Sequence, residues 1–333
     1  MNPPLVSLLV PCYNAAETLA ESLDSLCRQT CADMEILLCD DGSSDATLGI
    51  ADSFARKDPR IRVLRSAHEG IVPALQRLSA EASGAYFARM DADDIADPRR
   101  IEEQIRYMET HPEVGVCGTL VTISGATNSP GVQRYERWLN ALVEHDDIVR
   151  ELFVECPIAH PTFCMRRSAF EAVGGYEDRD WAEDYDLLMR LHERGFRFGK
   201  ISRSLLTWRH YEGRTSLTDP RYGLDRFRAL KRHYLERIYL GARPTLYQWG
   251  AGVVGKKWLR EWGTPRPKAV VDLHPRKIGE TIHGCPVIAP DALPSPGEAF
   301  TVIAVGAPGA REEIRAWFVE RDYVELEHFL FLS

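Results

Sequence analysis

The sequence lacks any apolar run long enough to cross a membrane, since its longest apolar stretches, residues 5–11 and 302–305, fall far short of the ~20 residues required. Pro3 and Pro4 stand where a signal peptide would carry basic residues, so we expect no export signal. None of the eight cysteines forms a CxxC pair, which favours reduced thiols and a cytoplasmic location. The net charge of −8 argues against a nucleic-acid binder.

The chain alternates apolar strand patterns with helical patterns and has no internal repeat. Its 333 residues are enough for two domains at ~100–200 residues each. The alternation predicts an α/β fold with a mostly parallel sheet. A break at residues 241–244 places the predicted domain boundary between 1–243 and 244–333. A long amphipathic, basic helix is predicted at 222–240, just before the boundary.

Three carboxylates directly follow a predicted strand at residues 86–90. They are Asp91, Asp93 and Asp94, with no basic residue between them. Such crowding costs electrostatic energy unless a cation neutralises it, and oxygen-only ligands suit Mg²⁺ or Mn²⁺. The alternative is an acidic helix cap without a metal.

Two earlier predicted strands end in further polar residues. Asp40 and Asp41 follow one strand, and Pro11, Tyr13 and Asn14 follow the other. Because the carboxyl ends of parallel strands meet at one edge of a sheet, we expect all these residues to lie near the three carboxylates. Tyr13 can stack on a base, and Asp41 can accept a hydrogen bond from a base N–H or a ribose hydroxyl. Asn14 also begins a capping-box pattern, and each strand end has an ordinary turn as its alternative.

These motifs, in this order and spacing, resemble the family-two glycosyltransferases over residues 5–215. The matching segments, in chain order, are Val-Pro-Cys-Tyr-Asn14, Gln29-Thr30 to Glu35-Ile36, Asp40-Asp-Gly-Ser-Ser-Asp45, Ala88-Arg-Met-Asp-Ala-Asp-Asp94, Gly118-Thr119, His160-Pro161, Gly174-Gly175-Tyr176 and Glu183-Asp184. The resemblance implies a GT-A fold, an inverting hexosyl transfer and a divalent metal. It also implies a UDP- or dTDP-sugar donor and a glycan or lipid-linked acceptor in bacterial surface polysaccharide synthesis.

The resemblance also implies roles for individual residues. Pro11, Tyr13 and Asp41 would hold the nucleoside, Asp91 would face ribose or a metal-bound water, and Asp93 would bind the metal. Asp184, paired with Glu183, would be the general base; the alternative is that this pair only caps a helix. One departure is His68-Glu69-Gly70, where the family often has Asn-x-Gly.

Two residues further along occupy positions where the family often carries an Arg and a His. Arg209 would neutralise the leaving diphosphate, and His210 is a tentative third metal ligand. An ordinary surface histidine is the alternative for His210.

The C-terminal part contains a glycine loop between a predicted strand and a predicted helix. Gly250, Gly252 and Gly255 form the loop, and Asp272 lies where a ribose-binding acid would stand. The segment resembles the small sugar-nucleotide-binding domain of bacterial sugar acetyltransferases, which implies a Rossmann-like accessory domain. A scaffold role is the alternative. A second function class, an NAD(P)-dependent sugar-nucleotide dehydrogenase, would use the same loop, although no proton relay is evident.

The segment from Arg203 to Arg243 carries ten Lys/Arg and four Asp/Glu residues. This excess of positive charge is compatible with peripheral contact at the inner face of the plasma membrane or with a lipid-diphosphate acceptor. A solvated helix docked on its own domain is the alternative. A third function class is a non-catalytic sugar-nucleotide-binding scaffold, which the retained Asp93 and Asp184 disfavour.

Overall fold

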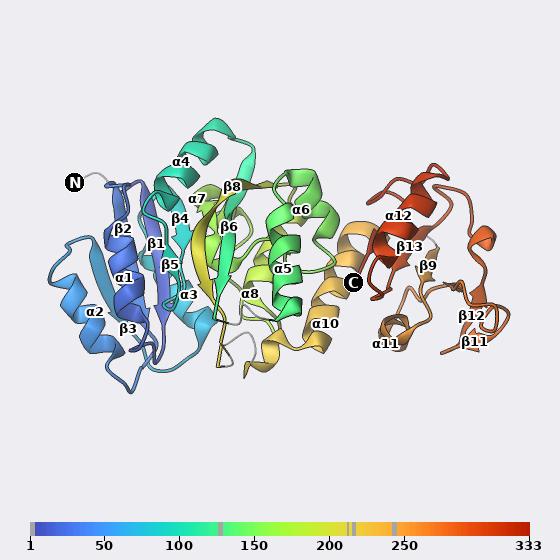
Figure 1. Cartoon of the computed structure of the whole chain (residues 1–333), viewed down its shortest axis with the longest axis horizontal. Helices are drawn as coiled ribbons and strands as arrows, with labels where there is room; N and C mark the ends of the chain where they lie inside the picture. Colours follow the sequence, from blue (N-terminus) through green and yellow to red (C-terminus); the bar gives the residue numbers. More distant parts are fainter. Residues whose placement is uncertain (1–3, 126–128, 212, 215–217, 242–244) are drawn as a thin grey trace. The chain divides into compact units, whose positions relative to one another are not determined.

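The computed structural model describes residues 4–125, 129–211, 213–214, 218–241 and 245–333 (Figure 1). It divides into two compact units. The first contains the chain up to Ile148 together with Pro157–Gly223, and the second contains Val149–Cys156 together with Leu224–Ser333.

The first unit is built on one eight-stranded sheet with the order β3-β2-β1-β4-β7-β6-β8-β5. Its strands are β1 (Val6–Cys12), β2 (Met34–Asp40), β3 (Ile61–Arg65), β4 (Tyr86–Arg89), β5 (Ile95–Ala96), β6 (Val114–Ser124), β7 (Cys164–Arg166) and β8 (Arg197–Arg209). Its helices are α1 (Leu19–Cys27), α2 (Thr47–Ala55), α3 (Ile71–Glu81), α4 (Arg100–Thr110), α5 (Pro130–Ala141), α6 (His145–Glu151), α7 (Arg167–Ala172) and α8 (Glu183–Glu193), with 3₁₀ turns η1 (His160–Thr162) and η2 (Pro220–Tyr222). The last residues of α6 belong to the second unit.

Strands β3, β2, β1 and β4 run parallel and form one half of this sheet. Every residue of β2 is buried, as expected for a parallel strand covered on both faces. Cys12 pairs with Asp40, and Leu9 pairs with Arg89, so the carboxyl ends of β2, β1 and β4 share one edge. The predicted mixed α/β fold is therefore confirmed, and the register brings the three polar strand ends together.

The second unit contains a smaller sheet with the order β11-β12-β10-β9-β13-β14. Its elements are β9 (Leu246–Trp249), β10 (Val270–Val271), β11 (Thr281–Ile282), β12 (Cys285–Ile288), β13 (Phe300–Ile303), β14 (Phe329–Phe331), α10 (Leu224–Leu235), α11 (Val253–Glu261), α12 (Ala310–Val319), the π-helical turn η3 (Glu236–Leu240) and the 3₁₀ turn η4 (Pro290–Ala292). Strands β12, β10, β9, β13 and β14 are parallel and lie in the 3-2-1-4-5 order of doubly wound sheets.

The division into units differs from the boundary predicted at residue 243, which itself falls among residues that the structure does not describe. The helix predicted at 222–240 corresponds to α10 and η3, and both pack within the second unit. Lys231 of α10 contributes to this grouping, because its buried ammonium donates to the carbonyl oxygens of Val154 (2.6 Å) and Leu332 (3.3 Å). Among the described residues, no helix is long and apolar enough to span a membrane.

Candidate functional site

The end of β1 is tied to the end of β2 through Asn14. Its backbone is left-handed (φ 46°), and its side-chain oxygen accepts a hydrogen bond from the Ser44 N–H at 2.9 Å. In return, the Asn14 N–H donates to the Ser43 hydroxyl at 2.9 Å. The predicted capping box at Asn14 is therefore wrong, because α1 begins only at Leu19 and the Asn14 side chain bridges two strand ends instead.

Asp41, predicted to accept a hydrogen bond from the donor's base or ribose, is buried and binds the loop at residues 66–70. Its carboxylate accepts from the backbone N–H groups of Glu69 (3.0 Å) and Gly70 (2.8 Å) and from the Ser66 hydroxyl (3.0 Å). The fourth contact is His68 Nδ1 at 3.0 Å. A carboxylate has about four acceptor positions, so this loop uses all of them. Its role toward a base stays a prediction, and a bound base would have to replace one of these contacts.

Tyr13, the predicted base-stacking residue, is exposed and already stacks on a ring from that same loop. The rings of Tyr13 and His68 are 3.9 Å apart between centroids and 14° from parallel. Gly42 permits this approach, since it adopts φ +72° and an added Cβ would lie 2.8 Å from the His68 backbone nitrogen. The pair therefore forms a flat aromatic surface beside the ends of β1 and β2.

The three carboxylates after β4 converge as predicted. Each of Asp91, Asp93 and Asp94 offers one oxygen, and these atoms lie within 4.8 Å of one another. Burial raises the pKa of Asp93, and the Asp91 charge adds to this effect. Asp94 is fully buried, and burial together with both neighbouring carboxylates raises its pKa well above the ordinary value.

This cluster could hold a divalent cation. All its donors are oxygens, which suits Mg²⁺ or Mn²⁺. One oxygen of Asp94 accepts from the Arg209 backbone N–H at 2.9 Å, while Oδ2 is buried and has no hydrogen-bond partner among the described residues. An unsatisfied buried carboxylate oxygen is costly, and a cation would satisfy it. The residues present therefore fit the predicted metal.

Arg89 lies two residues before the cluster and received no role from the sequence. The side chain of Arg89 is fully buried, and its guanidinium forms an ion pair with Asp91. The carboxylates thus have a basic partner, although no basic residue stands between them in the sequence. Asp91 is partly neutralised from within the sheet, which leaves Asp93 and Asp94 without an ion pair of this kind among the described residues.

Arg209 reaches the acidic cluster, whereas His210 does not join it. Arg209 Nη1 donates to the backbone oxygen of Asp93 at 2.9 Å, and its other nitrogen pairs with Glu21. In the described part of the chain, the group of side chains that could share an ion does not include His210. Burial, followed by the charge of Arg214, lowers the pKa of His210 to about 4, so its imidazole is neutral near pH 7.

The predicted acidic pair begins helix α8, and its two members have different environments. Glu183 is buried and accepts from the Tyr222 hydroxyl at 2.8 and 3.0 Å. Its Oε1 also lies 3.6 Å from Nδ1 of the buried His160. Asp184 is half-buried and accepts from the Tyr185 N–H at 2.7 Å. Asp184 is thus the more accessible carboxylate, whereas Glu183 is enclosed.

Tyr222 and His160 are site residues that received no role from the sequence. Tyr222 lies 39 positions from Glu183, so no local pattern indicates their contact. His160 belongs to one of the matching motifs, but that motif predicts no role for it. Its Nε2 lies 2.9 Å from the Tyr176 hydroxyl, so the polar contacts of Glu183 continue through His160 to Tyr176.

The glycine loop of the second unit packs tightly on itself. An added Cβ at Gly255 would lie 1.8 Å from the Gly250 carbonyl oxygen, so only glycine fits there. Asp272 accepts from the Ala251 N–H (3.1 Å) and pairs with Lys277 (2.8 Å). Gly252, in contrast, faces open space, and α11 begins directly after it.

Several cations of the basic segment are already paired within the chain. Arg228 pairs with Glu261 at 2.8 Å, Arg203 with Glu103, and Arg221 with Asp219 at 3.3 Å. These contacts reduce the positive charge that the segment presents outward. The Arg228–Glu261 pair lies within the second unit, which favours a helix docked on its own unit over a membrane-binding surface.

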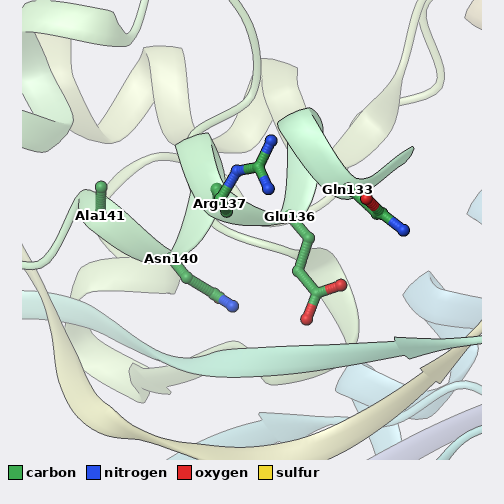
Figure 2. A pocket seen from close by; sticks show the side chains of 5 residues that line it. All are labelled: Gln133, Glu136, Arg137, Asn140 and Ala141. Carbon is green, nitrogen blue, oxygen red and sulfur yellow. The ribbon is translucent and has the colours of Figure 1, made fainter. Parts of the chain in front are cut away.

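A shallow depression of about 490 Å³ lies along one side of α5 (Figure 2). Its lining side chains are Gln133, Glu136, Arg137, Asn140 and Ala141. Asn140 binds the backbone of Val121 with both ends of its amide, at 2.8 and 2.9 Å, which anchors α5 to β6. None of these residues was predicted to belong to the site.

The chain is similar to several known glycosyltransferases. The chain is 33% identical over 207 residues to the putative glycosyltransferase EpsE of Bacillus subtilis, a match that covers 61% of this chain and 72% of that protein. It is 31% identical over 194 residues to the amylovoran biosynthesis glycosyltransferase AmsE of Erwinia amylovora, covering 57% and 71%. The S. aureus TarS 1–349 structure in complex with UDP-GlcNAc shares the fold, with a TM-score of 0.55 at 18% identity, covering 72% of this chain and 68% of that one.

These similarities extend the fold assignment to a family assignment. The TarS structure confirms the predicted GT-A type of α/β fold. Residues 7–174, just over half of the chain, match the family profile described as glycosyl transferase family 2, and they include the strand ends and the acidic cluster described above. The chain therefore belongs to glycosyl transferase family 2.

Proposed function

We propose that this protein is an inverting, metal-dependent glycosyltransferase. It moves a hexosyl group from a UDP- or dTDP-sugar to a hydroxyl of a glycan or lipid-linked acceptor in bacterial surface polysaccharide synthesis. The observation that carries the proposal is the convergence of Asp91, Asp93 and Asp94 at the carboxyl edge of the parallel strands, with an unsatisfied Asp94 oxygen. Two relatives support it by name, through amylovoran biosynthesis and a bound UDP-GlcNAc.

On the donor side, Asp93, Asp91 and Asp94 would hold Mn²⁺ or Mg²⁺. When bound, such an ion neutralises the donor diphosphate. Pro11, Tyr13, Asn14, Asp40 and Asp41 would surround the nucleoside, with the Tyr13–His68 surface available for stacking. Arg209 would add positive charge beside the leaving diphosphate. His210 lies outside the cluster, which makes it the weakest of these assignments.

On the acceptor side, Asp184 would act as the general base. It accepts the acceptor hydroxyl's proton as the oxygen bonds to the anomeric carbon and the bond from that carbon to the diphosphate oxygen breaks. One displacement at the anomeric carbon inverts its configuration and releases the nucleoside diphosphate. Glu183 is buried and accepts a hydrogen bond from Tyr222, so we assign it to positioning the start of α8 beside Asp184. Its predicted catalytic role stays a prediction.

For the second unit, we propose an accessory nucleotide site at Gly250, Gly252 and Gly255. Free N–H groups at the start of α11 favour a diphosphate, and Gly252 leaves room for it. Asp272 is already paired with Lys277, so a ribose hydroxyl would share it. A scaffold role is the alternative for this unit. Membrane contact through the segment from Arg203 to Arg243 is also a proposal. The ion pairs of Arg203, Arg221 and Arg228 reduce the positive charge that supports it.

The test is nucleotide binding to the full chain with and without Mn²⁺. Thermal-shift and calorimetric titrations with UDP, dTDP and their sugars should show Mn²⁺-enhanced binding, because a ligand selective for the native state raises its stability. Asp93→Asn should abolish the Mn²⁺ enhancement, whereas the matched change Asp52→Asn, at an acid of α2 paired with Arg65, should not. Turnover of NAD(P)H with a nucleotide sugar would instead favour the dehydrogenase.

A further inference from the structure

The imidazole ring of His68 makes the two contacts that Tyr13 and Asp41 are predicted to offer a nucleobase. Its ring lies 3.9 Å from the Tyr13 ring between centroids and 14° from parallel, as a stacked base would. Its Nδ1 lies 3.0 Å from Oδ2 of the Asp41 carboxylate, where a base N–H would donate. One side chain of this protein therefore occupies both groups that the base of a donor needs.

The hydrogen bond between His68 and Asp41 also has the direction expected for a base. Besides the carboxylate, Nδ1 lies 3.2 Å from the Asp41 backbone oxygen. A carboxylate and a carbonyl oxygen only accept, so we assign the hydrogen of the imidazole to Nδ1. His68 thus presents to Asp41 what a pyrimidine imide would present, a flat ring with an N–H at its edge.

The His68 side chain can leave this position without a change in the loop that carries it. The neighbouring backbone is fixed, because the N–H groups of Glu69 and Gly70 donate to Asp41 at 3.0 and 2.8 Å. The His68 side chain itself is 56% exposed. Rotation about its own bonds therefore takes the ring into solvent while both backbone hydrogen bonds stay in place.

The Ser66 hydroxyl, the other side chain that donates to Asp41 in the described part of the chain, is a poorer candidate for displacement. Its release would free one position on the carboxylate but would leave the Tyr13 ring stacked on His68. Only the departure of His68 uncovers the ring of Tyr13 and an oxygen of Asp41 together.

We propose that His68 is a built-in competitor of the donor nucleobase. This inference rests on the proposed transferase function and deepens it. In the closed position, the imidazole covers Tyr13 and binds Asp41; in the open position, it is turned outward and a planar base with an N–H takes its place. The base thus replaces the imidazole instead of stacking on the outside of the Tyr13–His68 pair.

This competition lowers the observed affinity for nucleotides. Only molecules in the open position bind a base, so the apparent dissociation constant rises as the open fraction falls. One stacked pair and one hydrogen bond together favour the closed position about tenfold. Removing the imidazole should therefore strengthen nucleotide binding by about the same factor, although it removes a residue of the site.

Calorimetry on the full chain with Mn²⁺ tests this expectation. His68→Ala should bind UDP about tenfold more tightly than the wild type does. Its affinity for inorganic pyrophosphate, which has no base, should change less than about twofold. His111→Ala is the matched control, because the His111 ring stacks on Tyr107 of α4 (4.2 Å between centroids, 17° from parallel) and this change should leave UDP affinity unaltered.

Proton NMR of the wild-type protein, with labelled histidine, follows the ring itself. The His68 C–H resonances are identified by their absence from His68→Ala. Stacked on Tyr13, these protons are shielded by the ring current of the phenol and resonate upfield of those of an exposed histidine. Saturation with UDP and Mg²⁺ should move them downfield, toward the exposed value.

The two measurements decide between the possible outcomes. A His68→Ala protein that binds UDP no more tightly than the wild type, or gains equally for pyrophosphate, overturns the competitor role and leaves the proposed function standing. His68 resonances that stay in place or move further upfield on UDP binding do the same, since the base would then not replace the ring. UDP and dTDP that bind neither protein reject the proposed function together with this inference.

Discussion

Replacing Tyr222 by phenylalanine removes a single oxygen that donates to both oxygens of the buried Glu183 carboxylate, at 2.8 and 3.0 Å. A hydrogen bond to a charged group contributes about 1.5–3 kcal/mol, and a neutral one about 0.5–1.5 kcal/mol. We therefore expect Tyr222→Phe to destabilise the protein by about 2 kcal/mol where Glu183 is ionised. Where Glu183 is protonated, the loss should be about 1 kcal/mol.

The sign of the pH dependence follows from the pKa of Glu183. Burial raises this pKa above its ordinary value in the folded protein, so between the two values the folded state binds more protons than the unfolded state. Stability from this group is consequently lost as the pH rises from about 4.5 through the raised pKa. Removing the Tyr222 donor raises the pKa further, because that donor favours the ionised form. The destabilisation by Tyr222→Phe should thus be larger at pH 8 than at pH 5.

Urea unfolding followed by circular dichroism at pH 5 and pH 8 measures the difference directly. Tyr86→Phe is the matched control in the same unit, because the Tyr86 hydroxyl accepts from Arg166 at 3.2 Å and arginine does not titrate in this range. Its destabilisation should be the same at both pH values. A Tyr222→Phe effect that is equal at pH 5 and pH 8, or larger at pH 5, would refute the reasoning that an ionised Glu183 depends on this phenol.

Three further outcomes can be checked with purified protein. Asp184→Asn should lower kcat by about 10²–10⁴-fold while UDP affinity by calorimetry stays near that of the wild type; a loss confined to UDP affinity would make it a donor-site residue. Gly255→Ala, whose new methyl would meet the Gly250 oxygen at 1.8 Å, should unfold the second unit at a much lower temperature in calorimetry, whereas Gly252→Ala, which faces open space, should not. A chain ending at residue 243 loses most of the second unit, with which residues 149–156 and Lys231 pack, including the Leu332 carbonyl that Lys231 binds. The surface exposed in this way should make the shortened chain bind a hydrophobic dye and aggregate. A monodisperse, fully active product would contradict this prediction.

Part of the site could be predicted because its signals are local. Asp91, Asp93 and Asp94 follow a strand, and the alternation of strand and helix patterns predicted that this strand end shares one edge of the sheet with the ends of the two earlier strands. Asp41 was also located correctly, at a strand end. Its carboxylate, however, is occupied by the 66–70 loop, and the sequence offers no way to count its hydrogen bonds.

Other contacts could not be predicted because they join distant positions. Tyr13 meets His68, and Glu183 meets Tyr222, across separations that no helical or strand period describes. The capping-box prediction at Asn14 failed for a related reason. A side-chain oxygen that can cap a helix can equally bind a neighbouring strand end, and only the packed chain selects between these two uses.

The sequence by itself determined the α/β architecture, the carboxyl-edge location of the acidic cluster and the family, because hydrophobic periodicity and motif order are written along the chain. Only the tertiary structure decided that Arg89 neutralises Asp91, that Glu183 is enclosed while Asp184 is the more accessible, and that α10 packs with residues 149–156. The physical reason is that burial and charge compensation depend on which groups share a space. That property emerges when distant segments pack together, and no stretch of neighbouring residues contains it.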